Sequence, residues 1–282
     1  PVYKADYRYF PLYRSNQEPW AIVSEVKINL DSIHVTLRSI FQVHNHFTAP
    51  ISIYCIENGQ YKEIAEVLPN CRCNVPLYAV YLHKGEIYFS MQGYKPSAQG
   101  ISWKEGSSNF NLSKSLQCDP LNTYEPFFIN AIRERQEVFH EVTTRHTMLS
   151  ASYIIHLRPT LTLKNCLPIG IQVCVLGCSV AREISLESPS ANQGEDYLDY
   201  GIKEVKPGEI LHLPTIKTSS KSKDNQTYIV VKLSQYLEKD WSCTTEIPSE
   251  PVDFVVWTFN SYDSVEIMSL QLGVRYVIFF LL

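Results

Sequence analysis

Apolar and polar residues alternate along much of this chain, in short runs separated by turn-forming residues. The clearest run is residues 31–56, DSIHVTLRSIFQVHNHFTAPISIYCI, where apolar side chains recur at every second position before and after a turn. Successive side chains of a β-strand point to opposite faces, so this period predicts strands with one buried face. Only residues 130–148 allow a helix, and their alternation fits a pair of charged strands about equally well.

The same pattern occurs twice in the chain. Residues 151–176, ASYIIHLRPTLTLKNCLPIGIQVCVL, align without a gap on residues 31–56, and Asn165 falls on Asn45. Further matches continue downstream, where the second copy carries extra residues in an acidic loop at 188–199. Self-similarity of this kind predicts one supersecondary unit that recurs along the chain. The predicted organisation is the tail of a preceding β-repeat at residues 1–30, a full repeat at 31–150, and a second repeat at 151–282 that ends at the first strand of the next.

Composition favours the same fold class. The chain has 18 Tyr, 12 Phe and 16 Pro, together with many Val, Ile and Thr. Aromatic and β-branched residues are enriched in strands, and proline-rich turns between short alternating runs are typical of β-sandwiches. We predict an all-β protein of tandem β-sandwich-like repeats that form an elongated array.

Charge and cysteine usage narrow the classes of function. The formal net charge of the 282 residues is −4, which argues against a nucleic-acid-binding surface. The 8 cysteines are spread along the chain and several occupy apolar strand positions, so we predict free thiols in a reducing compartment. The chain starts at Pro1 without a signal-peptide pattern, and we expect it to be part of a longer protein. The apolar run 276–282 is far shorter than the ~20 residues of a membrane helix, so we predict a buried strand there.

Two histidines in the stretch QVHNHF, residues 42–47, are candidate metal ligands. His44 and His46 lie two residues apart, so in a strand they share a face, and neutral imidazole is a good zinc ligand. The second copy has Lys164 and Cys166 at these positions, and no further ligand stands nearby at zinc-like spacing. We therefore predict no metal and no cofactor, with His44 solvated and His46 half-buried. A metal-dependent enzyme that uses both histidines is the alternative.

The asparagine between the two histidines is the residue that recurs. Asn45 and Asn165 each follow a predicted strand and precede a turn. Asparagine tolerates the left-handed backbone region, and its amide offers two donors and an acceptor that can tie a turn to a neighbouring strand. Removing it would leave buried backbone groups unpaired, at a cost of about 1–3 kcal/mol. We predict a structural role for both asparagines and no catalytic residues, because the sequence shows no partner nucleophile, phosphate-binding glycine loop or serine elbow.

The phrase LTLKNCLP, residues 161–168, resembles the repeat signature of the VAB (Vps adaptor-binding) domain of the vacuolar protein sorting thirteen family, the chorein-type bridge-like lipid transfer proteins. That domain comprises about six all-β repeats, each with one invariant asparagine, a position that Asn45 and Asn165 match. Further positions that fit are Pro207, Gly208 and Trp241. The first copy departs from the second at Thr48, which stands for Pro168, and at Asn70, which stands for Gly208.

This resemblance implies a non-enzymatic adaptor-binding module. Such a module captures adaptor proteins on organelle membranes through short Pro-X-Pro segments, and so recruits a bridge-like lipid transfer protein to membrane contact sites. Membrane association would then be indirect and on the cytoplasmic side, with no nucleic acid and no small-molecule substrate for this chain. The sequence names neither the adaptor-binding residues nor the adaptor. The alternative is an architectural spacer whose repeats have no ligand site of their own.

Overall fold

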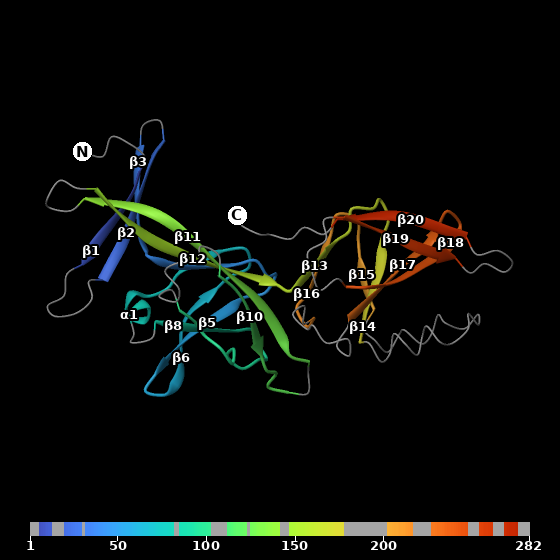
Figure 1. The fold of residues 1–282 in the computed structure, drawn as a ribbon, viewed down its shortest axis with the longest axis horizontal. Helices are drawn as coiled ribbons and strands as arrows, with labels where there is room; N and C mark the ends of the chain where they lie inside the picture. The colour runs from blue at the N-terminus through green and yellow to red at the C-terminus, as the bar shows by residue number, and fades with distance from the viewer. Residues whose placement is uncertain are drawn as a thin grey trace. The chain divides into compact units, whose positions relative to one another are not determined.

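The computed structural model describes residues 6–12, 20–29, 32–81, 85–102, 112–122, 125–141, 147–177, 202–216, 227–247, 254–261 and 268–275 (Figure 1). They form two compact units, named here unit 1 (within residues 1–160) and unit 2 (within residues 161–280). Almost every element is a strand, so the all-β prediction is confirmed. The one helix of the described residues is the short α1 (Leu77–Val80).

Unit 1 contains two sheets. The larger has eight strands: β1 (Asp6–Leu12), β2 (Trp20–Asn29), β3 (Ser32–Ser39), β4 (Phe41–Asn45), β7 (Arg72–Asn74), β10 (Leu112–Cys118), β11 (Phe127–Glu141) and β12 (Thr147–Pro159). The smaller has four: β5 (Ile51–Glu57), β6 (Gln60–Val67), β8 (Glu86–Ser90) and β9 (Ile101–Ser102). The order in the larger sheet is β3-β2-β1-β11-β12-β4-β7, with β10 paired to β11, and that in the smaller is β6-β5-β8-β9. Of the segment 130–148, which allowed a helix or a strand pair, the described residues 130–141 and 147–148 belong to the antiparallel pair β11 and β12.

Two strand pairs of the larger sheet are parallel, β1 with β11 and β12 with β4. In the second pair Ile155 lies opposite Val43, and His156 lies opposite His44. Residues 151–159 of β12 open the second sequence copy, yet they pair with a strand of the first. The boundary between the compact units therefore follows Thr160, whereas the predicted sequence repeat starts at 151.

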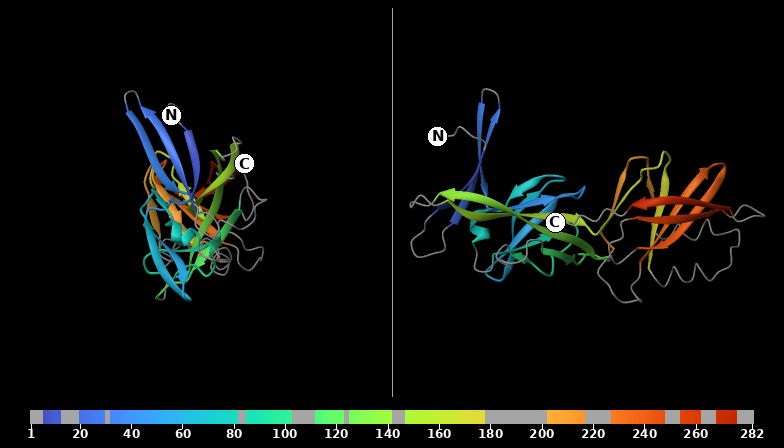
Figure 2. Two further views of the ribbon diagram at one scale, coloured as in Figure 1. Left: turned by 90° about the vertical axis from the view of Figure 1, so that its left-hand side faces the viewer. Right: turned by 45° about the horizontal axis from the view of Figure 1, so that its top comes forward.

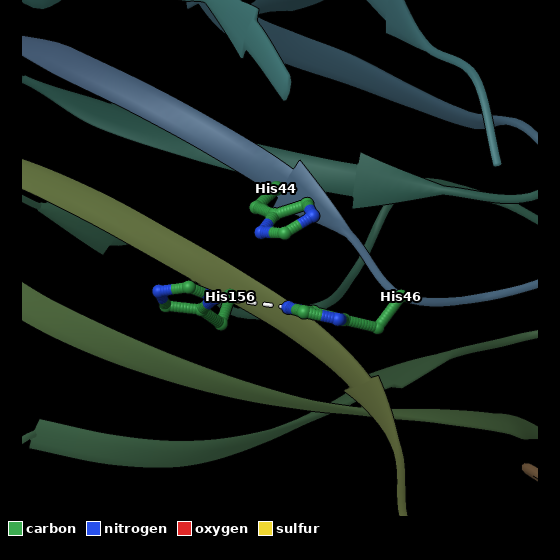
Figure 3. Close-up of side chains that lie close together, drawn as sticks. All are labelled: His44, His46 and His156. Carbon is green, nitrogen blue, oxygen red and sulfur yellow. Dashed lines mark hydrogen bonds between the residues drawn. The ribbon is translucent and has the colours of Figure 1, made fainter. Parts of the chain in front are cut away.

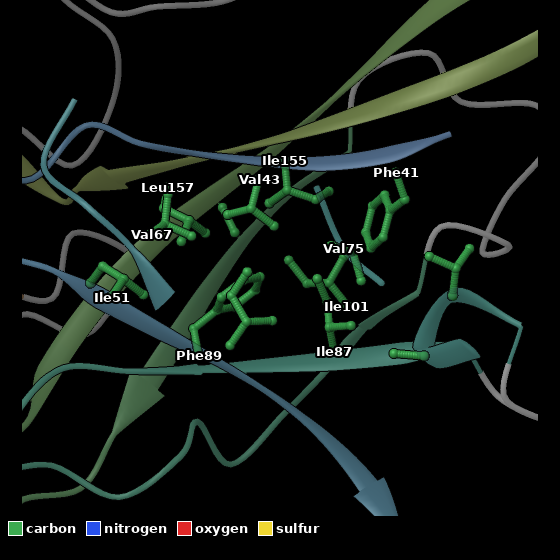
Figure 4. Close-up of a cluster of buried hydrophobic side chains, with 14 of the residues drawn as sticks. Phe41, Val43, Ile51, Val67, Val75, Ile87, Phe89, Ile101, Ile155 and Leu157 are labelled. Carbon is green, nitrogen blue, oxygen red and sulfur yellow. The ribbon is translucent and has the colours of Figure 1, made fainter. Parts of the chain in front are cut away.

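Side chains from both sheets of unit 1 share one core (Figure 4). Along β4 the burial alternates, so Phe41, Val43 and Asn45 face the core while Gln42 and His44 face the other side of the sheet. The parallel partner β12 adds Ile155 and Leu157, both fully buried. The smaller sheet contributes Ile51, Ile53, Ile87, Phe89 and Ile101. The alternating pattern thus puts the repeated asparagine inside the core and the histidine before it outside.

Unit 2 has its own sheets and its own core. Its strands are β13 (Leu161–Lys164), β14 (Ile171–Gly177), β15 (Lys203–Val205), β16 (Ile210–Leu213), β17 (Thr227–Tyr236), β18 (Lys239–Glu246), β19 (Phe254–Ser261) and β20 (Met268–Arg275). β13 pairs with β16, and the others form a sheet in the order β15-β14-β17-β18-β19-β20. Trp241, Trp257 and Phe259 are the largest side chains buried in this core.

Some features that the sequence suggested lie outside the described residues, namely the acidic loop at 188–199 and the apolar run 276–282. Within the described residues, no helix has the length and apolar character needed to cross a membrane. The cysteines that the structure describes are free: Cys55, Cys71, Cys73, Cys118, Cys166, Cys174 and Cys243.

Candidate functional site

Asn45 is fully buried at the end of β4, where its side chain makes three hydrogen bonds. Its Nδ2 donates to the carbonyl of Ala49 at 2.8 Å and to the carbonyl of Val67 at 3.0 Å. Its Oδ1 accepts from the backbone N–H of Phe47 at 2.8 Å. The amide therefore ties the turn after β4 to itself and to the end of β6, leaving none of its polar atoms idle.

Asn165 makes the same three hydrogen bonds in unit 2, where it is 2% exposed. Its Nδ2 donates to the carbonyls of Ile169 at 2.8 Å and Val205 at 2.9 Å, and its Oδ1 accepts from the N–H of Leu167 at 3.0 Å. Each partner stands at the matching place in its own copy. That the two asparagines stabilise their units remains a prediction.

The turn facing each asparagine is also the same in both copies, despite a change of residue. Asn70 has φ of 55° and Gly208 has φ of 77°, so both occupy the left-handed region. In each turn the following N–H donates back three residues, from Cys71 to the carbonyl of Leu68 at 3.1 Å and from Glu209 to that of Lys206 at 3.0 Å. Asparagine is the residue other than glycine that adopts this conformation most readily, so the departure at position 70 keeps the backbone unchanged.

Three histidines meet on the other face of the larger sheet in unit 1 (Figure 3). His44 lies on β4, His46 directly follows it, and His156 lies on β12, in register with His44. One ring nitrogen from each lies within 4.8 Å of the others. We call these three residues the histidine cluster. His44 and His46 are half-buried and His156 is 6% exposed, so His44 is less solvated than predicted.

A chain of hydrogen bonds runs through the cluster to a carboxylate. Nε2 of His46 lies 2.9 Å from Nδ1 of His156, and Nε2–H of His156 donates to Oε2 of Glu134 at 2.8 Å. Gln136 also donates to this carboxylate, at 3.1 Å. Because Glu134 fixes the proton of His156 on Nε2, the Nδ1 lone pair of His156 points at His46.

Burial and neighbouring cations keep the three rings neutral. Burial, followed by the repulsion that a protonated His46 would meet from a protonated His44 and from the guanidinium of Arg158, lowers the pKa of His46 to about 3. Burial and the guanidinium of Arg72 lower the pKa of His44, and burial lowers the pKa of His156 against the opposing pull of Glu134. Burial alone would raise the pKa of Glu134, but the hydrogen bonds from Gln136 and His156 outweigh it and hold that pKa below its usual range.

Sequence reasoning missed His156 and Glu134. The prediction of no metal rested on the lack of a third ligand near positions 44 and 46, and the structure supplies that ligand from 110 residues away. The register of the parallel pair brings it there, and a local spacing pattern carries no signal of that register.

Comparison with known proteins finds sequences similar to this chain. A family model described as "Vacuolar-sorting associated protein 13, adaptor binding domain" matches residues 3–242. The chain belongs to this family. The resemblance noted on residues 161–168 is therefore confirmed, and the family is one of adaptor-binding domains.

Curated relatives of this adaptor-binding domain are far longer than the chain. Intermembrane lipid transfer protein VPS13C of Mus musculus is 29% identical over 247 residues, and that of Homo sapiens is 27% identical over 250 residues. Intermembrane lipid transfer protein VPS13A of Mus musculus is 22% identical over 268 residues. The matches cover 86%, 86% and 94% of the chain but only 6%, 6% and 8% of these relatives.

Proposed function

We propose that this chain is a non-catalytic adaptor-binding module that recruits an intermembrane lipid transfer protein to organelle membranes and contact sites. It does so from the cytoplasmic side, by binding short Pro-X-Pro segments of adaptor proteins. The family match over residues 3–242 carries the proposal. The lipid-transfer role is taken from the names of the relatives, of which the chain spans only a small part.

The edge of the larger sheet in unit 1 offers a place for such a segment. β3 pairs with β2 and ends the strand order, and the two strands project as a ribbon from the body of the unit (Figures 1 and 2). On β3, the side chains of Ile33, Val35 and Leu37 are 53%, 55% and 62% exposed and share one face of the strand. An extended peptide can add a strand to such an edge and place alternate side chains against an apolar face.

The spacing of a Pro-X-Pro segment suits this kind of binding. In an added strand, alternate residues direct their N–H and C=O groups at the sheet edge, and the residues between direct theirs away. Two prolines two residues apart both fall on the outward positions, where the missing N–H costs nothing. The residue between them then supplies the hydrogen bonds to β3.

The test is binding of a fluorescent Pro-X-Pro peptide panel to the purified chain, followed by anisotropy. We expect micromolar binding that Val35→Lys weakens at least about tenfold. The substitution would put a charge beside the apolar side chains that the added peptide strand places on the same face of the sheet. The matched control is Val256→Lys, on the exposed face of β19 in unit 2, where the valine is 48% exposed. Lack of binding by the folded protein, or equal effects of the two substitutions, would count against recognition at this edge.

A second candidate is the architectural spacer, and one observation favours it. Residues 33–37 of β3 align with residues 153–157 of β12, which pair in parallel with β4 instead of meeting solvent. On this reading the β3 edge is filled by a β4-like strand of another repeat. Hydrogen exchange of residues 32–39 in a longer protein separates the two candidates. Protection without any adaptor favours the spacer, and protection that appears only with a bound peptide favours recognition.

A further inference from the structure

The histidine cluster has the composition of a transition-metal site. Three imidazoles from two neighbouring strands converge, and the ring centroids of His44 and His46 are 4.0 Å apart while those of His46 and His156 are 5.2 Å apart (Figure 3). Three histidines are a donor set that zinc adopts in proteins, with the fourth position open. Among the described residues, these three histidines form the group of metal-ligating side chains whose ligand atoms all lie within 4.8 Å of one another.

One ring nitrogen of the cluster has no hydrogen-bond partner within the described part of the protein. Nδ1 of His44 is buried and makes no hydrogen bond. An unsatisfied buried polar atom costs about 1–3 kcal/mol and calls for an explanation such as an ion. Neither neighbouring ring donates to Nδ1 of His44, since the N–H between His46 and His156 already serves the hydrogen bond of that pair.

The contact between His156 and Glu134 is one that metal-ligating histidines commonly make. In metal sites a ligating histidine commonly donates its second ring N–H to a carboxylate, which fixes the tautomer and raises its basicity. His156 makes this contact with Glu134, at 2.8 Å, and therefore presents Nδ1 to the centre of the cluster.

We propose that His44, His46 and His156 bind one zinc-class transition-metal ion, with Glu134 as the residue that orients His156. The ion replaces the proton between His46 and His156, and His46 carries its proton on Nδ1 instead, so no net proton is released. The 2.9 Å separation of these two nitrogens then widens to about 3.3 Å, the value for tetrahedral Zn–N bonds of about 2.05 Å. Water takes the fourth position, reached through the half-buried side of the cluster.

The charges around the cluster set the strength of binding. Arg72 and Arg158 both lower the pKa of the cluster histidines, so they also oppose a dication. Arg72 is exposed and thus screened by solvent, while the Glu134 carboxylate and the loss of the unsatisfied His44 nitrogen act in favour of the ion. We expect micromolar rather than nanomolar affinity for Zn²⁺.

Such an ion would fasten β12 to β4. His156 and His44 are directly opposed in the parallel pair, so one ion bonds both strands at the place where the second sequence copy begins. The second copy has Lys164 and Cys166 in place of His44 and His46, so the fastening belongs to unit 1. This site is independent of the proposed adaptor binding, which lies on β3.

The test titrates ZnCl₂ into the EDTA-treated chain, with a chromophoric chelator as competitor and thermal unfolding as a second readout. We expect one ion per chain and a rise in the Tm of unit 1 of about 5–10 °C at 100-fold excess over Kd. Bound Co²⁺ should show the visible absorption of a tetrahedral site. His44→Asn and His46→Asn should each weaken binding at least about tenfold, and Glu134→Gln about 10–100-fold.

The matched control is His212→Asn, which removes a half-buried histidine of unit 2 that contacts Thr162. It should leave the stoichiometry and affinity unchanged. Circular dichroism in EDTA checks that each variant is folded, and Glu134→Gln keeps an acceptor for His156 if a histidine variant is not. The proposal is overturned if the folded chain takes up no Zn²⁺ at about 100 µM, or if binding survives the His44 and His46 substitutions.

Discussion

Replacing Asn165 with serine should destabilise unit 2 strongly. The substitution removes three hydrogen bonds, leaving two carbonyls and one N–H of the turn without the partners described above. The bond to Val205 is fully buried and the other two are partly buried. At about 1–3 kcal/mol for the buried group and less for each of the others, the loss is about 3–4 kcal/mol. A domain of this size has a total stability of about 5–15 kcal/mol, so the loss is large.

Urea unfolding followed by tryptophan fluorescence measures this loss, because Trp241 and Trp257 both lie in the core of unit 2. The midpoint should fall with little change in slope, and the Tm should drop by about 10–15 °C. Asn165→Asp should be at least as damaging, since it keeps the acceptor but sets a second oxygen against two carbonyls. The neighbouring exposed residue provides the control, and Cys166→Ser should change the stability by less than about 0.5 kcal/mol.

Substitutions of the unit 1 histidines test whether the hydrogen bonds of Asn165 carry the stability assigned to them. In EDTA, His44→Ala and His46→Ala should each cost less than Asn165→Ser, because the half-buried rings make fewer hydrogen bonds. If all three substitutions lower stability equally, or if Asn165→Ser behaves like Cys166→Ser, the asparagine hydrogen bonds do not carry the stability assigned to them.

Three further predictions concern the backbone, the pH and the packing. Gly208 has φ of 77° with open space where a Cβ would lie, so Gly208→Val should cost about 1–2 kcal/mol from backbone strain while Gly208→Asn, the residue of the first copy, costs less; urea unfolding of unit 2 compares them. The pKa of His46 is about 3 in the fold and 6.5 otherwise, so metal-free unit 1 should be fully stabilised above pH 6.5 and lose stability as the pH falls toward 3. Between pH 7 and 5 we expect a loss of about 1 kcal/mol after allowing for solvent screening. The loss should be smaller in His46→Asn, where the lowered pKa values of His44 and His156 still contribute, and a flat profile in the wild type contradicts the prediction. A Cβ at Gly100 would lie 2.9 Å from Cζ of Tyr88, so Gly100→Ala should lower the free energy of unfolding of unit 1 by about 1–3 kcal/mol in urea unfolding. Gly93→Ala, where the space is open but φ is 90°, measures the cost of backbone strain alone for comparison.

Features set by local pattern were predictable from the sequence. Period-two alternation gave the strands around residues 41–45 and 51–57, and the offset between the two copies singled out Asn45 and Asn165. The asparagine hydrogen bonds follow from strand-then-turn order because two of the three partners lie within four residues. Short-range geometry of this kind is encoded in short stretches of chain.

Features set by long-range register were not predictable in this way. His156 meets His44 because β12 runs parallel to β4, and a shift of one residue would have sent His156 to the opposite face. The same pairing moved residues 151–159 into the first compact unit. The change from Gly208 to Asn70 looked like a departure between the copies, and only the φ values of the fold reveal it as an equivalent turn.

The parallel pair of β12 and β4 has a consequence for how a protein of this kind can be divided. The predicted sequence repeat and the compact unit do not share a boundary, since β12, which opens the second predicted copy, pairs with β4 of the first. A cut at residue 150 would strip Ile155 and Leu157 from the core of the first copy, whereas a cut at 160 leaves that core whole. Tension along the backbone would load β12 against β4 in shear, across the hydrogen bonds between these two strands. Unit 1 is thus completed by a strand that the sequence alignment assigns to the second copy, and we expect its resistance to being pulled apart to depend on that strand.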